Sequence, residues 1–264
     1  MPLFPRAYAL ARRAGLVDRP WFDAVFSRSY FLYKRWLEDP FHGLARRSPE
    51  LFRGGHVVDV GANIGYTAVV FARAVEPGRR VLALEPEARN FALLEKAIAR
   101  CGVAARVRAV RAAAGAADGT IELWRNVDHH GDHRVATDAF RRAHPRAGTE
   151  AVSLRTVDSL VAEHLEGGAV AFVKIDVQGY EPAVLAGMGG TLAANRRLAI
   201  AFEYAPAGMR ELGEDPEALL ATLREGGFRL HRLARSGRLA PASAADLDAV
   251  VRARGYTDLL ALRG

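Results

Sequence analysis

The stretch VVDVGANIGYTAVVFARAV, residues 57–75, decides the fold: an apolar run ends in a glycine turn, and an apolar helical pattern follows. A strand, a tight turn and a helix in this order form the first unit of a nucleotide-binding α/β sheet. A dinucleotide turn, G-x-G-x-x-G, needs a glycine where Asn63 stands, so the seat for a pyrophosphate is missing. No Gly-Lys-Ser/Thr follows, which excludes a P-loop. The turn of Gly61, Asn63 and Gly65 therefore indicates a nucleoside ligand without phosphates.

The next apolar run supplies a carboxylate for such a ligand. Glu85 ends the run RVLALE, 24 residues after Gly61, near the spacing at which an acidic residue binds a ribose diol. Asp59 in the first run and Pro86 after Glu85 complete the predicted cofactor wall. S-adenosylmethionine fits, because it carries an adenosine and an amino-acid tail but no phosphate. The alternative, in which the glycines only end a strand and Glu85 lies in solvent, stays open.

Apolar runs alternate with helical patterns from His56 onward. Runs that are apolar on both faces predict covered strands of a mostly parallel sheet, and the patterns between them predict crossover helices. Strands are expected at 56–60, 80–85, 105–110, 169–177, 198–204, 228–233 and 257–263. Helices are expected at 65–75, 86–102, 156–165, 181–195 and 216–227.

Two segments stand outside this alternation. Residues 1–50 are rich in aromatic side chains and are expected to form helices that pack on a catalytic domain spanning 51–264, with a membrane-surface role as the alternative. Residues 116–156 begin with TIELWR and return with AVSLRTV. This pattern predicts an inserted hairpin with a polar loop, between the third and fourth parallel strands.

Composition limits the partners and the compartment. The formal charge is +7, but only three of the 37 basic residues are lysines, and the arginines are scattered. Scattered charge favours a solvated surface over a nucleic-acid groove. The start of the chain has no secretory signal pattern. The sequence contains no run of 18 or more apolar residues, so no membrane-spanning helix is predicted. The single cysteine, Cys101, excludes a disulfide within the chain and favours a cytoplasmic location.

Several stretches together resemble the FkbM-type S-adenosylmethionine-dependent methyltransferases, over roughly residues 50–235. They are VVDVGANIGYTAVVFA, EPEARNFALLEKAI, SLRTVDSLV, FVKIDVQGYEPAVLAGM and IAFEY. The resemblance implies a Rossmann-like class I methyltransferase fold with a mostly parallel sheet and an antiparallel last strand. It also implies O-methylation of a hydroxyl on a sugar, glycan or natural product.

The resemblance assigns roles to particular positions. It implies that Gly61, Asn63 and Gly65 line the cofactor, that Glu85 binds its ribose, and that the adenine passes Ala113 and Ala114. One departure is Gln178, where the family usually carries an acidic residue. A role for a carboxylate at that position is therefore in doubt.

Methyl transfer to a hydroxyl needs a group that accepts the proton, or a metal that acidifies it. Lys174 and Asp176 share one face of an apolar strand, and Glu203 ends the next strand. We predict these three and His133 as catalytic residues, with Asp176 or His133 as the base and Asp176 also beside the cofactor. A structural pair between Lys174 and Asp176, or between Lys174 and either Glu85 or Glu181, is the alternative.

The insertion carries the polar cluster DHHGDHR, residues 128–134, which is expected to face the acceptor. The predicted substrate contacts are His129, His130, Arg134 and, outside the insertion, Glu181. A Mg²⁺ or Mn²⁺ ion held by Asp176, Glu203 and a histidine stays open as an alternative.

Three rival functions were weighed. Methyltransferases that act on flipped bases commonly carry Asn/Asp-Pro-Pro-aromatic after the fourth strand, where this chain reads DVQGYE. A non-catalytic S-adenosylmethionine-binding scaffold and a nicotinamide oxidoreductase stay open until binding and turnover are measured. The expected partner is a hydroxylated small molecule or glycan, and both a monomer and a homo-oligomer fit the sequence.

Overall fold

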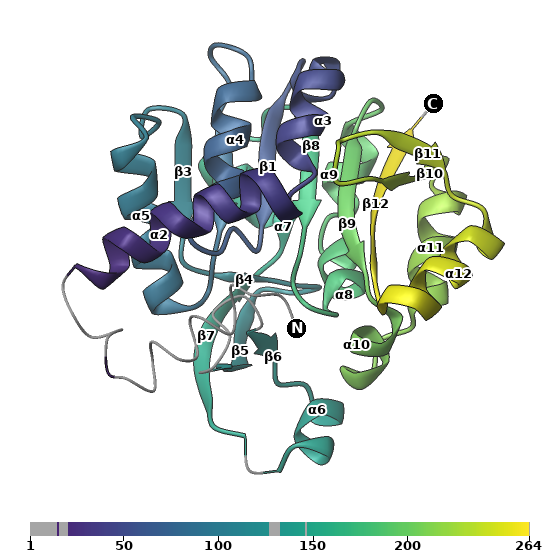
Figure 1. Cartoon of the computed structure of the whole chain (residues 1–264). Coiled ribbons are helices and arrows are strands. Elements are labelled where there is room, and N and C mark those ends of the chain that lie inside the picture. Colours follow the sequence, from purple (N-terminus) through teal and green to yellow (C-terminus); the bar gives the residue numbers. More distant parts are fainter. Residues whose placement is uncertain (1–14, 16–20, 127–132, 146, 264) are drawn as a thin grey trace.

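The computed structural model describes Gly15 and residues 21–126, 133–145 and 147–263. An eight-stranded sheet forms its centre (Figure 1), in the order β11-β10-β12-β9-β8-β1-β2-β3. Its strands are β1 (His56–Val60), β2 (Val81–Leu84), β3 (Val107–Val110), β8 (Val170–Ile175), β9 (Ala199–Tyr204), β10 (Phe228–Leu233), β11 (Leu239–Pro241) and β12 (Thr257–Arg263).

The strand directions confirm the expected Rossmann-like sheet. β1 pairs in parallel with β2 and β8, and the outer pairs β2·β3 and β8·β9 are also parallel. The last strand, β12, runs antiparallel to both of its neighbours, β9 and β10. All seven predicted strands are present, and β11 is an eighth strand that was not predicted. It is a three-residue return from β10, too short to show a strand period in the sequence.

Helices cover both faces of this sheet and form two hydrophobic cores. Successive residues of a strand point to opposite faces, so Val57 lies in one core and Val58 in the other. The Val57 core contains Phe52 stacked on Phe172, with 4.6 Å between ring centroids. This face carries α3 (Phe41–Arg47), η3 (Pro49–Phe52), α4 (Tyr66–Ala74) and α5 (Ala88–Arg100). The opposite face carries α7 (Val157–His164), α8 (Glu181–Ala186), α9 (Gly189–Ala194), α11 (Pro216–Glu225) and α12 (Ala244–Arg254).

The helix predicted over 181–195 is split into α8 and α9. A side chain at Gly187 would overlap the backbone carbonyl of Gly115, so the chain passes close to the insertion between the two helices. Two further helices, α10 (Pro206–Glu211) and α12, were not predicted. Across the described residues, no helix is long and apolar enough to cross a lipid bilayer.

The insertion builds a second, four-stranded sheet at the edge where the parallel strands end (Figure 1). β5 (Gly119–Trp124) and β7 (Thr149–Arg155) form the predicted antiparallel pair, with Gly119 opposite Leu154 and Trp124 opposite Thr149. The sheet also contains β4 (Ala113–Ala114) and β6 (Arg134–Val135), and helix α6 (Asp138–Ala143) lies in the connection between β6 and β7. The insertion is therefore a small folded unit, larger than the hairpin that was predicted.

The N-terminal extension is helical between residues 22 and 47 and packs beside the first crossover helices. α2 (Phe22–Tyr33) continues into a π-helical turn, η2 (Lys34–Glu38). Phe22 and Phe26 of α2 lie in one apolar cluster with Ile64 and Leu93, and Asp23 forms an ion pair with Arg89 of α5 at 3.0 Å. Figure 1 shows α2 (purple) running across this helical layer.

Candidate active site

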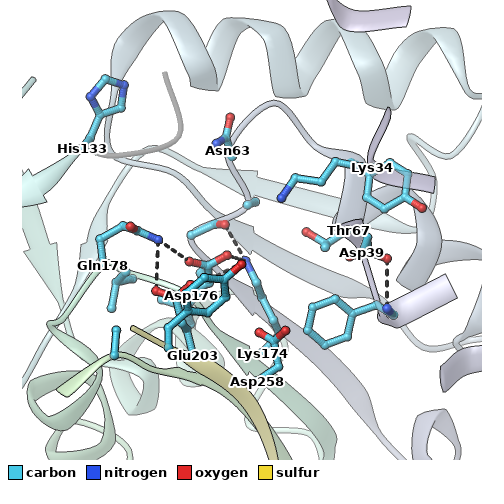
Figure 2. A pocket seen from close by; sticks show the side chains of 18 of the residues that line it. Lys34, Asp39, Asn63, Thr67, His133, Lys174, Asp176, Gln178, Glu203 and Asp258 are labelled. Atoms are coloured by element: carbon cyan, nitrogen blue, oxygen red, sulfur yellow. Dashed lines mark hydrogen bonds and ion pairs between the residues drawn. The ribbon is translucent and has the colours of Figure 1, made fainter. Parts of the chain in front are cut away.

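A cavity of about 840 Å³ lies where the parallel strands end, between the main sheet, the insertion and the N-terminal extension. The sheet contributes the turn after β1, Glu85 after β2, Asp176 after β8 and Glu203 on β9. The extension contributes Lys34 and Asp39, and the insertion contributes His133 and Arg134. Most of the residues predicted for the cofactor and for catalysis therefore meet in one pocket (Figure 2).

The turn after β1 is shaped by a close backbone crossing. Gly61 has φ +75°, and a Cβ at this position would overlap the carbonyl oxygen of Asp176. Asn63 also has a positive φ, 50°, which asparagine tolerates better than most residues because its short side chain bonds the local backbone. Its Oδ1 accepts a hydrogen bond from the Ile64 amide at 2.7 Å. The turn thus needs glycine at 61 but accepts asparagine at 63.

Glu85 braces this turn from β2. Its two carboxylate oxygens accept hydrogen bonds from the amides of Asn63 (2.9 Å) and Glu87 (3.0 Å). Burial raises the pKa of Glu85 to about 7, against the lowering effect of those two hydrogen bonds. Glu85 lines the cavity, so it faces the space where a ribose is predicted while it holds the turn in shape.

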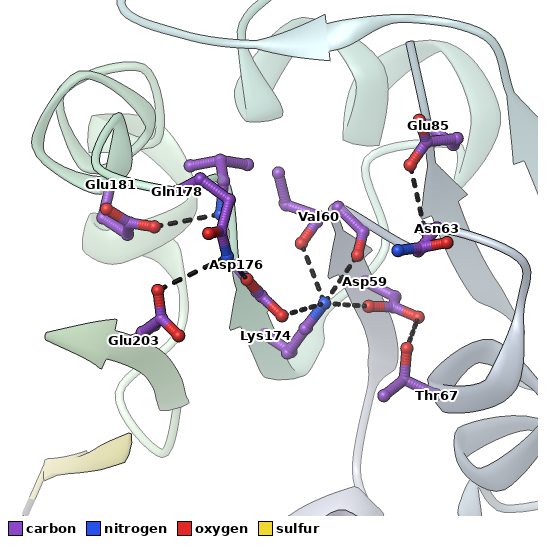
Figure 3. A network of polar contacts seen from close by, with 12 residues as sticks. Asp59, Val60, Asn63, Thr67, Glu85, Lys174, Asp176, Gln178, Glu181 and Glu203 are labelled. Atoms are coloured by element: carbon purple, nitrogen blue, oxygen red, sulfur yellow. Dashed lines mark hydrogen bonds and ion pairs between the residues drawn. The ribbon is translucent and has the colours of Figure 1, made fainter. Parts of the chain in front are cut away.

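Lys174 lies at the centre of a buried polar network beneath the turn (Figure 3). Its Nζ lies 3.3 Å from Asp59 Oδ1 and 3.5 Å from Asp176 Oδ2, and it donates to the carbonyl oxygen of Gly61 at 2.7 Å. Burial alone would lower the pKa of Lys174, but Asp59 and Asp176 raise it above its ordinary value. Thr67 donates to the other oxygen of Asp59 at 2.6 Å. Lys174 therefore pairs with Asp59 and Asp176, and Glu85 and Glu181 have other partners.

Asp176 and Glu203 are two carboxyl groups of the pocket whose pKa values are shifted in opposite directions. The Gln178 amide donates to Asp176 Oδ1 at 2.9 Å and lies 3.4 Å from Glu203 Oε2. Burial alone would raise the pKa of Asp176, but Lys174, Lys34 and the hydrogen bond from Gln178 together hold it below the ordinary value. Burial, with the charge of Asp176, raises the pKa of Glu203 well above its ordinary value. Asp176 thus favours the ionised form and Glu203 the protonated form, and pKa values shifted in opposite directions are the arrangement that separates base and acid roles in enzymes.

The predicted acceptor loop is only partly described. His129 and His130 lie outside the described residues. His133 lines the cavity, and its Nδ1 accepts a hydrogen bond from the Asn126 amide at 3.2 Å. Figure 2 places His133 apart from the group formed by Asp176 and Glu203. Arg134 also lines the cavity and forms an ion pair with Glu211 of α10 at 2.7 Å.

Glu181 has a different place from the one predicted. It does not line the cavity, and its side chain is buried. Its carboxylate accepts hydrogen bonds from the amides of Val177 and Gly179, both at 2.9 Å. Since both oxygens bond to the loop after β8, Glu181 shapes that loop and is turned away from the cavity where a substrate contact was predicted.

The remaining predicted cofactor residues divide into a lining and a supporting group. Pro86, Ala113 and Ala114 line the cavity. Asp59 lies behind it, under Lys174, and Gly65 starts α4 with φ +89° against Leu94. Asp59 and Gly65 therefore contribute to the predicted cofactor site indirectly, by holding the turn after β1 in shape.

Several pocket residues were missed in the sequence. Lys34 and Asp39 come from the extension, whose position over the sheet no local pattern gives. Asp258 starts β12 and lies opposite Glu203. A signal for Asp258 existed, because the start of an antiparallel strand lies at the same edge as the ends of its parallel neighbours.

A family model described as Methyltransferase FkbM domain matches residues 59–230. The chain belongs to this family. The FkbM methyltransferase from Methylobacillus flagellatus KT is 17% identical with a TM-score of 0.51, covering 88% of this chain and 50% of that one. EvdMO1 is 15% identical with a TM-score of 0.43, and the match covers 86% of this chain and 41% of EvdMO1. The O-methyltransferase TomG from Streptomyces achromogenes is 13% identical with a TM-score of 0.46, and the match covers 100% of this chain and 91% of TomG.

The family model establishes the family, and the likeness to the Methylobacillus flagellatus structure establishes the fold. The chain spans half or less of the length of the first two of these structures, and no curated protein matches it. The family and the fold are those of S-adenosylmethionine-dependent methyltransferases.

The Mg²⁺ alternative finds no support in the FkbM domain. Within residues 21–126, 133–145 and 147–263, no group of three or more His, Cys, Asp or Glu side chains is arranged to hold a metal ion. Instead, the Gln178 amide, a hydrogen-bond donor, lies between Asp176 and Glu203. A donor in this place is the wrong chemistry for a cation site.

Proposed function

We propose that the protein is an S-adenosylmethionine-dependent O-methyltransferase that acts on a hydroxyl of a sugar, glycan or natural product. The observation that carries the proposal is the state of Asp176. Its side chain is 40% exposed at the cavity, and Lys174, Lys34 and Gln178 together hold its pKa below the ordinary value against the effect of burial. A carboxylate at this edge of the sheet is available to accept a proton from an acceptor.

The residues present fit the proposed cofactor. A carboxylate that ends β2, as Glu85 does, suits a ribose diol, and the alanines of β4 leave room for a flat base. Gly61 and Asn63 lie between Glu85 and Asp176 and line the space for the reacting part. When bound, S-adenosylmethionine supplies a methyl group that is already strongly electrophilic.

The protein's own contribution is placement and proton transfer. A hydroxyl held against Asp176 gives its proton to the carboxylate as its oxygen attacks, since an aliphatic hydroxyl keeps its proton far above neutral pH. Placement of the attacking oxygen in line with the methyl group supplies much of the remaining rate. The raised pKa of Glu203 supports this step, because its protonated form donates a hydrogen bond and adds no negative charge beside the ionised base.

Binding and turnover test the proposal separately. Calorimetry should show binding of S-adenosylhomocysteine and no binding of NADH. Glu85→Ala should weaken S-adenosylhomocysteine by about 1–3 kcal/mol, because the ribose hydroxyls lose a charged acceptor. Turnover is measured as tritium transfer from methyl-labelled S-adenosylmethionine to a panel of monosaccharides, glycosides and hydroxylated polyketides. Binding without transfer to any of them would favour a non-catalytic scaffold, and NADH binding in place of S-adenosylhomocysteine would overturn the proposal.

A further inference from the structure

The N-terminal extension brings a cation to the pocket. Lys34 is the first residue of the π-helical turn η2, which follows α2 directly, and π-helical turns are frequent at functional sites. Lys34 lines the cavity together with Tyr30 and Tyr33. Figure 2 shows its side chain extending from the extension toward the side of the pocket that holds Asn63.

The charge of Lys34 acts on two carboxyl groups that line the same cavity. Burial raises the pKa of Asp39 to about 6, and Lys34 is the largest charge that opposes the rise. Lys34 also adds to the effect of Lys174 in holding the pKa of Asp176 below its ordinary value. A second cation at this place is not redundant with Lys174, because Asp59, Asp176 and two backbone carbonyl groups already surround Lys174.

A hydroxyl donor lies on the same wall. Tyr66, the first residue of α4, lines the cavity, and its buried hydroxyl has no hydrogen-bond partner among the described residues. Lys34 Nζ lies 5.7 Å from the centre of the Tyr30 ring, and Tyr30 packs in the same apolar cluster as Tyr66, so the two groups lie on the same side of the pocket. A buried hydroxyl without a partner is rare in folded proteins, and an anion in the cavity beside it would accept a hydrogen bond from it.

We propose that Lys34, with the Tyr66 hydroxyl, binds the carboxylate of the methionyl tail of S-adenosylmethionine. This inference rests on the proposed function, because it takes the ribose to lie at Glu85 and the methyl group near Asp176. The tail then leaves the reacting centre on the side away from the adenine wall of Ala113 and Ala114. A charge-assisted bond from Lys34 and a neutral bond from Tyr66 together suit one carboxylate.

Two ligands that differ only in this tail test the inference without an acceptor. S-adenosylhomocysteine carries the carboxylate, whereas 5′-methylthioadenosine keeps the adenine, ribose and sulfur but lacks the amino-acid tail. Lys34→Met should weaken S-adenosylhomocysteine about tenfold to hundredfold in calorimetry, the usual effect of losing a charge-assisted bond. It should leave 5′-methylthioadenosine within about twofold. Tyr66→Phe should show the same selective loss at a smaller size, about threefold to tenfold.

Arg28→Met is the matched control, because Arg28 is a cation of α2 that is exposed and does not line the cavity. It should change neither affinity. A wild-type measurement needs no variant: raising the salt from 0.05 to 0.5 M should weaken S-adenosylhomocysteine more than 5′-methylthioadenosine. Unchanged binding of S-adenosylhomocysteine by Lys34→Met overturns the inference, and so does an equal loss of both ligands. If wild type binds neither ligand, the proposed function itself fails, and the inference fails with it.

Discussion

The Nζ atom of Lys174 lies 3.3 Å from Oδ1 of Asp59, and both side chains are buried beneath the turn that follows β1. Removing one partner of such a pair leaves a charge in the interior without compensation. The pair also ties β8 to β1, because Lys174 donates to the carbonyl oxygen of Gly61. The ion pair therefore links the stability of the sheet to the shape of the cofactor wall.

Lys174→Met should lower the free energy of unfolding by about 3–5 kcal/mol, the range for a broken buried ion pair. Urea unfolding followed by circular dichroism measures the change. Lys96→Met is the matched control: Lys96 forms an ion pair with Asp23 at 3.4 Å, but its side chain is 66% exposed. Its loss should cost less than about 1 kcal/mol, and equal losses in the two variants would contradict the role given to Lys174.

Asp176→Asn keeps the shape of the side chain and removes the proposed proton acceptor. Turnover on an acceptor that wild type methylates should fall by roughly 10² to 10⁴. Affinity for S-adenosylhomocysteine should stay within about threefold, and the melting temperature should show a folded protein, because Lys174 keeps Asp59 as a partner. Full activity in a stable Asp176→Asn protein would remove Asp176 from the reaction.

Arg134→Met tests the acceptor side of the pocket. If Arg134 contacts the acceptor, the variant should raise KM for the acceptor roughly tenfold, the effect of one lost bond to a charged group. Cofactor affinity should stay unchanged. The matched variant is Glu211→Gln, because Arg134 and Glu211 form an ion pair at 2.7 Å. The same KM change in both variants would mean that Arg134 only joins the insertion to α10.

Glu181 should make stability depend on pH. Burial raises its pKa from 4.5 to about 7, so the folded state favours the protonated form. This contribution is fully present below pH 4.5 and is lost as the pH rises through about 7. Wild type should therefore lose up to about 3 kcal/mol of stability relative to Glu181→Gln between pH 4.5 and 8. Urea unfolding across this range measures the difference, and the exposed Glu95→Gln should show no such trend.

The sequence predicted the elements whose signal is local. β1, β10 and β12 have the expected bounds, because each is an apolar run long enough to show its period between clear breaks. The insertion was harder, since β6 has two residues and α6 has six, and both depend on contacts with distant parts of the chain. Phe140 of α6, for example, packs against Leu212, which no local pattern reveals.

The candidate site was predictable where the strands themselves set it. Glu85, Asp176 and Glu203 follow or end buried strands, and parallel strands bring their ends to one edge. The partners of these groups could not be predicted in the same way. Lys174 could have paired with any of several nearby carboxylates, and only the register of β1 against β8, with Asp59 opposite Lys174, selects its partner. Glu181 does not line the pocket where it was expected to contact the substrate, because its side chain turns back onto its own loop.

Some residues that line the cavity lie inside the region matched by the family model, here called the floor, and others lie outside it, here called the walls. The family model ends at residue 230 and starts at residue 59, so Gly61, Glu85 and Asp176 belong to the shared floor. Lys34 and Asp258 lie beyond these limits and form walls around the same cavity. The pocket is therefore completed by segments on both sides of the family's shared region. A segment cut to the family limits would keep the glycine turn and Asp176 but lose Lys34 and Asp258 from the pocket.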